Sequence, residues 1–189
     1  MTDEIKLISG LRKQDKDSFE EFVNLYKDTI FNVCAGLIQN FDDADDLTQD
    51  VFVDVFNSIV DFKGESSLKT WVYRIAVNKS LELIRKRSRK KRFAHLVSLF
   101  GNKEELQIPD FEHPGVKLEN KERAAVMFKA IAKLPETQRT AFTLNKVEEF
   151  SYKEISEIMK ISVSSVESLL FRAKGNLKKY LEKYYFDKI

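Results

Sequence analysis

Carboxylate side chains gather within one short stretch of this chain, NFDDADDLTQDVF at residues 40–52. Asp42, Asp43 and Asp46 have the D-D-x-x-D spacing that suits a magnesium ion and, through the metal, a diphosphate. Such a site needs a second acidic cluster that faces the first, but the other acids are scattered among lysines or lie in a segment without periodicity, as Asp110 and Glu112 do. A metal-dependent enzyme is therefore kept only as an alternative hypothesis. Our own expectation is that the protein has no metal site and no cofactor.

Two other interpretations apply to the same stretch. Acids in the first turn of a helix stabilise its dipole by about 0.3 to 1 kcal/mol each, which accounts for Asp42 and Asp43. The next residues lie beyond that turn and occupy one face of the expected helix: Asp46, Gln49, Asp50, Val53 and Asn57. This face is either solvated or a docking surface for a basic partner, and the stretch by itself favours solvation.

Basic residues gather a short distance further on, in RKRSRKKR at residues 85–92, where only Ser88 is uncharged. Such a run exceeds what the C-terminus of a helix needs to balance its dipole, so phosphate binding is at least as good an explanation. Arg74, Asn78 and Arg85 lie along one side of the same expected helix. The loop FKGESS before it places Phe62 and small polar groups nearby, which suits unstacked bases.

The formal net charge of +2 hides a strong separation of charge along the chain. Residues 28–62 contain eight aspartates and no lysine or arginine, whereas residues 63–95 contain eleven basic residues against two glutamates. Opposite charges on neighbouring segments predict two different partners, one attracted to each sign.

Composition favours an all-α protein. Only 6 Gly and 3 Pro interrupt 189 residues, and the long stretches between them have helical rather than alternating periodicity. No stretch has the apolar length of a membrane-spanning helix, and the first residues lack the pattern of a signal peptide, so we expect a cytoplasmic protein without membrane insertion. Cys34 stands alone and only two histidines accompany it, which excludes a Cys/His zinc set.

The first domain is predicted over residues 1–95. A helix with capping candidates Asp17 or Ser18 continues to about residue 38, and a second runs over about 43–60. After a loop around Gly64, a long helix is expected over about 68–92.

Residues 96–122 lose periodicity, are rich in acids and predict a flexible linker. The second domain, over 123–189, begins with two helices hinged at Pro135. A short helix follows, with Ser151 and Glu154 at capping-box spacing, and then a tight turn and a final helix over about 164–183. This order predicts a helix-turn-helix.

The final helix has the side chains that a major-groove reader needs. Val166, Leu170 and the residues that follow them at helical spacing face inward. Short polar groups and then cations remain on the open side: Ser164, Ser165, Glu167, Ser168, Phe171, Arg172 and Lys174. Glu167 either accepts from the N4 amine of a cytosine or closes a capping box with Ser164.

Taken in order, these motifs resemble bacterial RNA polymerase sigma factors of the extracytoplasmic-function group, group IV of the sigma-70 family. The resemblance lies in DADDLTQDVF, in FKGESSLKTWVYRIAVN and in the segment from LPETQRTAF to SLLFRAK, and it covers nearly the whole chain. Each motif is moderately specific, and the ordered set is highly specific.

The resemblance implies a role for each surface. Docking on the basic clamp helices of the polymerase β′ subunit would fall on Asp46, Gln49, Asp50 and Val53. Melting and reading of the promoter −10 element, with capture of a flipped base, would fall on Phe62, Lys63, Gly64, Glu65, Ser66, Ser67, Arg74, Asn78 and Arg85. Duplex reading of the −35 element would fall on Ser165, Glu167, Ser168, Phe171, Arg172 and Lys174. Glu167 and Leu169 depart from the basic residues that many members carry there, which leaves the −35 sequence open.

The partners implied are core RNA polymerase, through its β′ clamp and β subunits, promoter DNA and an anti-sigma factor. The family threads its linker through the RNA exit path, which fits an acidic segment. We expect no catalytic activity and poor binding to free DNA. The alternatives are a helix-turn-helix regulator that acts without core polymerase, the magnesium-dependent enzyme, and a structural protein that bridges two partners.

Overall fold

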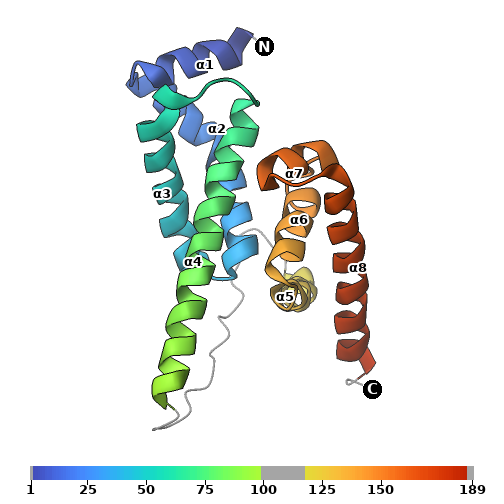
Figure 1. Ribbon diagram of the computed structural model, residues 1–189. Coiled ribbons are helices and arrows are strands. Elements are labelled where there is room, and N and C mark those ends of the chain that lie inside the picture. The colour runs from blue at the N-terminus through green and yellow to red at the C-terminus, as the bar shows by residue number, and fades with distance from the viewer. Residues whose placement is uncertain (1, 99–117, 187–189) are drawn as a thin grey trace.

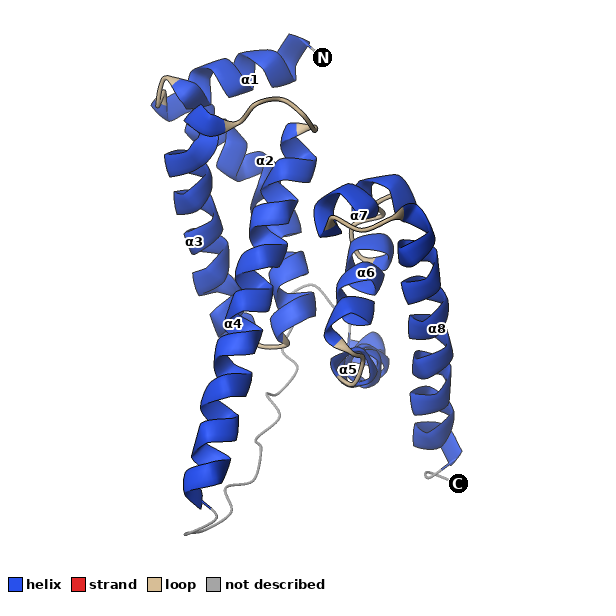
Figure 2. Ribbon diagram, in the orientation of Figure 1, coloured by secondary structure: helices blue, strands red, loops and turns tan. Residues whose placement is uncertain are grey.

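The computed structural model describes residues 2–98 and 118–186, including the side chains of residues 3–90 and 125–182. These residues form eight α-helices and one short 3-10 helix, with no strand among them (Figure 2). The all-α prediction is confirmed.

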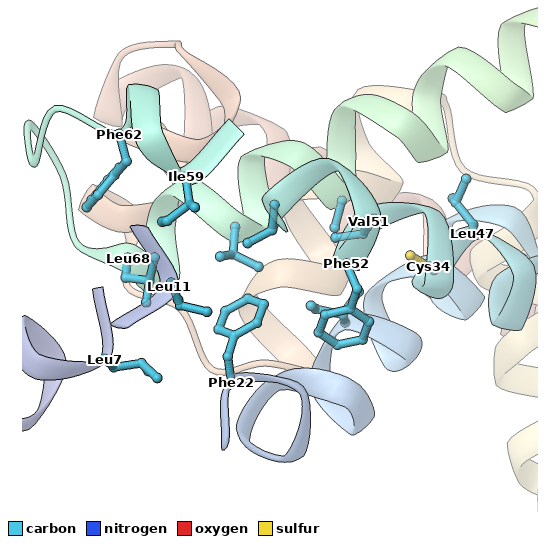
Figure 3. Close-up of a cluster of buried hydrophobic side chains, with 14 of the residues drawn as sticks. Leu7, Leu11, Phe22, Cys34, Leu47, Val51, Phe52, Ile59, Phe62 and Leu68 are labelled. Atoms are coloured by element: carbon cyan, nitrogen blue, oxygen red, sulfur yellow. The ribbon is translucent and has the colours of Figure 1, made fainter. Parts of the chain in front are cut away.

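Five helical segments make up the N-terminal helices: α1 (Thr2–Arg12), α2 (Lys16–Ile38), α3 (Phe41–Ser58), the 3-10 helix η1 (Ile59–Asp61) and α4 (Leu68–Ser98). Helices α2, α3 and α4 pack against one another, and α1 crosses their end beside the 62–67 loop (Figure 1). Their core holds Phe22, Val51 and Ile59 (Figure 3), and all three are fully buried. Val55 is fully buried in the same cluster. The apolar side chains of α3 thus face α2 and α4, and the acidic side chains of α3 point outward.

The starts of α2 and α3 lie slightly earlier than the sequence pattern indicates. Asp15, rather than Asp17 or Ser18, caps α2, because its carboxylate accepts the Ser18 amide hydrogen at 2.9 Å. Asn40 caps α3 in the same way, with 2.9 Å from its side-chain oxygen to the Asp43 amide nitrogen. A residue with positive φ precedes each cap and turns the chain.

The C-terminal helices are α5 (Leu118–Ala132), α6 (Glu136–Lys146), α7 (Tyr152–Met159) and α8 (Val163–Phe186). Helices α7 and α8 form the predicted helix-turn-helix, with Lys160 in the left-handed region at the turn. The capping box of Ser151 and Glu154 is confirmed, because each side chain satisfies a backbone amide of the other residue. Ser162 caps α8, since its hydroxyl oxygen accepts from the Ser165 amide at 3.2 Å.

The predicted linker of residues 96–122 is shortened by helix at both ends, because α4 runs to Ser98 and α5 begins at Leu118. The rest of that segment lies outside the described residues. The two helix sets also pack against each other, since Val33 and Val77 share one buried cluster with Leu144 and Ile155. The domain limits drawn at residues 95 and 123 remain a prediction.

Candidate functional site

The acidic face of α3 points to solvent. Leu47, Val51 and Val55 hold the opposite side of the helix in the core. Each predicted docking residue is consequently exposed, including the apolar one, Val53, which is 56% exposed: the set is Asp46, Gln49, Asp50 and Val53. Neither Asp46 nor Asp50 makes an ion pair with another described residue. These carboxylates are therefore available to a partner.

Cations of α4 border this face. Lys79 pairs with Asp54 at 3.0 Å, and Arg87 pairs with Asp43. The pairing of Asp43 removes one of the three carboxylates that a magnesium site at this stretch requires. Among the residues that the structure describes, no three acidic, histidine or cysteine side chains lie close enough to hold a metal ion. The geometry that the magnesium alternative needs is therefore not met in this part of the chain.

The loop before α4 presents small polar groups at the surface. Gly64 has a φ of +74°, which an L side chain rarely adopts, so this position allows the sharp turn. Most of the predicted contact residues here are exposed and Ser66 is half-buried: Lys63, Gly64, Glu65, Ser66 and Ser67.

Phe62 requires a correction. The sequence places Phe62 among the residues that contact an unstacked base, but the side chain is only 5% exposed. Its ring centroid lies 5.2 Å from that of Trp71 (Figure 3 shows Phe62 above Ile59 and Leu68). An aromatic side chain of this size is stabilised by burial in the adjacent core. The buried ring of Phe62 therefore anchors the start of the loop.

The predicted contact side of α4 faces the C-terminal helices. Asn78 is exposed, whereas Arg74 is half-buried and donates to the Glu157 backbone carbonyl at 2.9 Å. Arg85 pairs with Glu136 at 2.8 Å. The Nε of Arg74 is buried without a hydrogen-bond partner among the described residues, a costly state for a charged donor.

The predicted contact side of α8 is exposed along its length. Val166 and Leu170 are buried, and the predicted −35 residues lie on the other side: Ser165, Glu167, Ser168, Phe171, Arg172 and Lys174. Phe171 is 79% exposed, so a large apolar ring lies on the same surface as the serines and cations. The capping box of Ser164 with Glu167 does not form, because Ser162 is the residue positioned to cap the helix. Glu167 thus remains on the open surface.

The two predicted contact surfaces face each other across one cleft. Arg74, Asn78 and Arg85 line one wall. Ser165, Ser168 and Arg172 line the other. The cleft has a volume of about 610 Å³, which is the size of a small-molecule site rather than of a groove that admits duplex DNA. In this closed arrangement, part of each surface is covered by the other.

A buried seam holds the closed arrangement together. Tyr73 of α4 is fully buried, and its ring meets that of Phe150 edge to face, with 4.6 Å between centroids. Its hydroxyl donates to the Glu148 carboxylate at 2.9 Å. Burial raises the pKa of Tyr73, so this hydroxyl keeps its proton. The Lys69 ammonium lies 4.2 Å from the centre of the Phe150 ring, a favourable cation–π geometry.

Acidification should favour this closed arrangement. Burial raises the pKa of Glu148, while hydrogen bonds from Tyr73 and Asn32 and the charge of Lys69 lower it less. The neutral carboxyl is therefore favoured when the seam is closed, so its contribution to closure is complete at low pH and is lost as pH rises through the raised pKa. As the pH falls from neutral towards the ordinary pKa of a glutamate, energy transfer between fluorophores on α3 and α8 should therefore increase. Glu148→Gln should flatten this change, and an unchanged pH dependence in that variant would assign it to other groups.

The seam has no signature in the sequence. Tyr73 and Phe150 have the ordinary spacing of core residues, and Glu148 lies in the turn that follows α6. Nothing in the periodicity of either segment indicates that they meet, because the contact joins residues 75 positions apart.

Known proteins match both helix sets in the same order. The family model "Sigma-70 region 2" matches residues 22–90, and "Sigma-70, region 4" matches residues 124–177. The ECF RNA polymerase sigma factor SigW of Bacillus subtilis is 32% identical over 93% of this chain and 95% of its own length. The ECF RNA polymerase sigma-E factor of Haemophilus influenzae is 31% identical, with 89% of each chain covered.

Solved structures share the fold. CnrH, in a structure with the cytosolic domain of CnrY, superposes with a TM-score of 0.71 at 19% identity, covering 95% of this chain and 97% of that one. No helix within the described residues is long and apolar enough to cross a membrane.

Proposed function

This chain belongs to the extracytoplasmic-function (ECF) RNA polymerase sigma factors, and we therefore propose that it binds core RNA polymerase and directs initiation at particular promoters. It melts the −10 element and binds the −35 element as duplex. The chain itself contributes no catalytic step, acts in the cytoplasm with the polymerase and falls within group IV of the sigma-70 family.

The observation that carries this proposal is the placement of opposite charges on separate faces of the N-terminal helices. The face of Asp46, Gln49, Asp50 and Val53 is exposed and anionic, which suits the basic clamp helices of the β′ subunit. Arg74, Asn78 and Arg85 of α4 line the cleft towards the C-terminal helices instead, so polymerase and DNA do not compete for one surface.

The −10 element falls to the 62–67 loop and to Arg74, Asn78 and Arg85. Extruding a base from the duplex costs a few kcal/mol, which contacts to the separated strand must offset. Small polar groups at Ser66 and Ser67 and the amide of Asn78 supply hydrogen bonds for that purpose. Phe62 is left out of the direct contacts, because its ring is buried.

The −35 element falls to α8, whose exposed serines lie near its N-terminus and whose Arg172 and Lys174 follow for phosphates. Ser165, Ser168 and Arg172 line the cleft, so duplex DNA contacts the whole of this face only when the cleft between α4 and α8 opens. Opening releases Arg74 from Glu157 and Arg85 from Glu136, so both cations become available to promoter DNA at the same step. The closed arrangement explains the expected poor binding to DNA alone.

The proposed partners are core polymerase, through its β′ clamp and β subunits, promoter DNA and an anti-sigma factor. An anti-sigma factor that stabilises the closed arrangement would keep the cations of α4 covered.

Asn78 tests the melting role directly. Asn78→Ala should reduce open-complex formation by about tenfold, since one amide that contacts the separated strand is lost, and should leave initial duplex binding within about twofold. Permanganate reactivity of thymines at a responsive promoter measures melting, and a gel shift of the closed complex measures binding. Asn24→Ala, at an exposed amide on α2 outside the predicted contact residues, is the matched control. Equal loss of melting and binding would contradict the role.

A further inference from the structure

The N-terminal helix α1 contacts both ends of the 62–67 loop. At the start of the loop, the Arg12 guanidinium donates to the backbone carbonyl of Phe62. At its end, the Glu4 carboxylate accepts from the Leu68 amide at 2.9 Å. Leu68 is the first residue of α4. Two side chains of α1 therefore hold the two ends of the loop, at Phe62 and Leu68.

The loop has little else to hold its shape. Lys63, Gly64 and Glu65 are exposed, and the side chains of Lys63 and Glu65 make no hydrogen bond to another described residue. Among the described residues, the Ser66 hydroxyl donates only to the neighbouring Ser67 carbonyl, at a long 3.4 Å. A segment this exposed is ordered mainly through its ends, because ordering a backbone without compensating contacts is unfavourable.

Glu4 also acts on the start of α4. The first amides of a helix lack partners within the helix, and Ser67 satisfies only one of them, the amide of Thr70 at 3.1 Å. The Glu4 carboxylate satisfies the amide of Leu68 and places a negative charge at the positive end of the helix dipole. The orientation of α4, which holds Asn78, is thereby linked to α1.

Apolar contacts fix α1 in this position. Leu7 and Leu11 are buried in the same cluster as Ile59, Phe62 and Leu68, directly beneath the loop (Figure 3). A depression of about 500 Å³ lies between the helix and the loop, with Ser9 and Arg12 on the α1 wall and Lys63 on the other. Helix α1 lies before residue 22, where the match to the family model begins.

From these contacts we infer that Glu4 and Arg12 are positioning residues for base capture: α1 holds the 62–67 loop and the start of α4 in the geometry that selects the −10 base. This inference rests on the proposed function, because it assigns a role only if the loop receives a base. A captured base gains most from a loop already in its bound shape, since ordering the loop upon binding would lower both affinity and selectivity.

The test uses the full chain with core RNA polymerase and a promoter selected by the wild-type chain, with its −10 and −35 positions randomised. Sequencing of the transcripts gives the selectivity at each position. Glu4→Ala and Arg12→Met should each lower selectivity at the captured −10 base by about fivefold, the order expected for loss of one charge-assisted contact. Selectivity at the −35 element should stay unchanged. Glu4→Gln, which keeps an acceptor for the Leu68 amide, should recover part of the loss.

Controls separate positioning from general stability. Asp3→Ala and Lys6→Met remove exposed charges from the same helix and should leave both elements unaffected. A purely structural role lowers the active fraction without changing the base preference of the molecules that remain folded. If the wild-type chain selects no promoter, the proposed function fails; if it does and the variants select the same −10 base equally well, the positioning role is overturned. A parallel fall at both elements in Glu4→Gln and Arg12→Lys would overturn it as well.

Discussion

Replacing Asp46 and Asp50 together with lysine is expected to lower the affinity of this chain for core RNA polymerase by about a hundredfold, because two attractive charges become repulsive against a basic partner surface. Both side chains are exposed and unpaired among the described residues, so the fold should be unaffected. Titration of labelled chain with core enzyme measures the affinity, and thermal unfolding checks the fold.

A matched control variant has the same change in net charge, but at positions outside the docking face. Glu21→Lys with Asp28→Lys reverses two exposed acids on α2, away from the docking face, and should bind core enzyme nearly as well as the wild type. The affinity difference should also shrink as salt is raised, since exposed charges are screened. Equal affinities of the two double variants would show that the acidic face of α3 is only a solvated surface.

A disulfide between α2 and α6 should prevent open-complex formation by holding the two helix sets closed. A Cβ built on Gly36 lies 3.6 Å from the Cβ of Thr143, within the range that a disulfide spans. In the wild type that Cβ would meet the Thr143 methyl group at 2.7 Å, so the glycine is needed for this close approach. Exchanging both residues for cysteine removes the obstructing methyl and supplies the two sulfurs.

The oxidised Gly36→Cys, Thr143→Cys variant should form open promoter complexes at least about a hundredfold more slowly than its reduced form. The disulfide leaves the conformation in which α4 and α8 are separated almost unpopulated. Addition of reductant should restore the wild-type rate. Cys34 should not interfere, since burial raises its pKa to about 11 and its thiol stays protonated at neutral pH. Each single cysteine variant is the control. Full activity of the cross-linked chain would show that the closed arrangement is compatible with promoter melting.

Most helices can be predicted from the sequence because their positions depend on local signals. The apolar spacing of α3 and the capping box of Ser151 and Glu154 lie within a few residues of one another, so the chain alone specifies them. The predicted start of α2 is wrong because Asp15, Asp17 and Ser18 are all acceptable caps. Only the left-handed turn at Gln14 selects Asp15.

Features that depend on distant contacts cannot be predicted in this way. The burial of Phe62 cannot be predicted, because the pocket beneath it is built by α1 and by Trp71, which no local pattern reveals. The acidic face does lie on the outside of α3, because helical periodicity decides which side is buried. That Arg74 and Arg85 contact the C-terminal helices is not foreseeable, since Glu157 and Glu136 lie across the intervening segment.

Run-off transcription from a random promoter library, with purified core RNA polymerase and this chain, tests the central claim most directly. Core enzyme and chain together should yield transcripts whose promoters share two elements at a fixed spacing, and neither component alone should enrich any element. The chain by itself should not shift the selected DNA at physiological salt. A shift of that DNA without polymerase, in the absence of chain-dependent transcripts, would contradict the claim and identify a regulator that acts without the core enzyme.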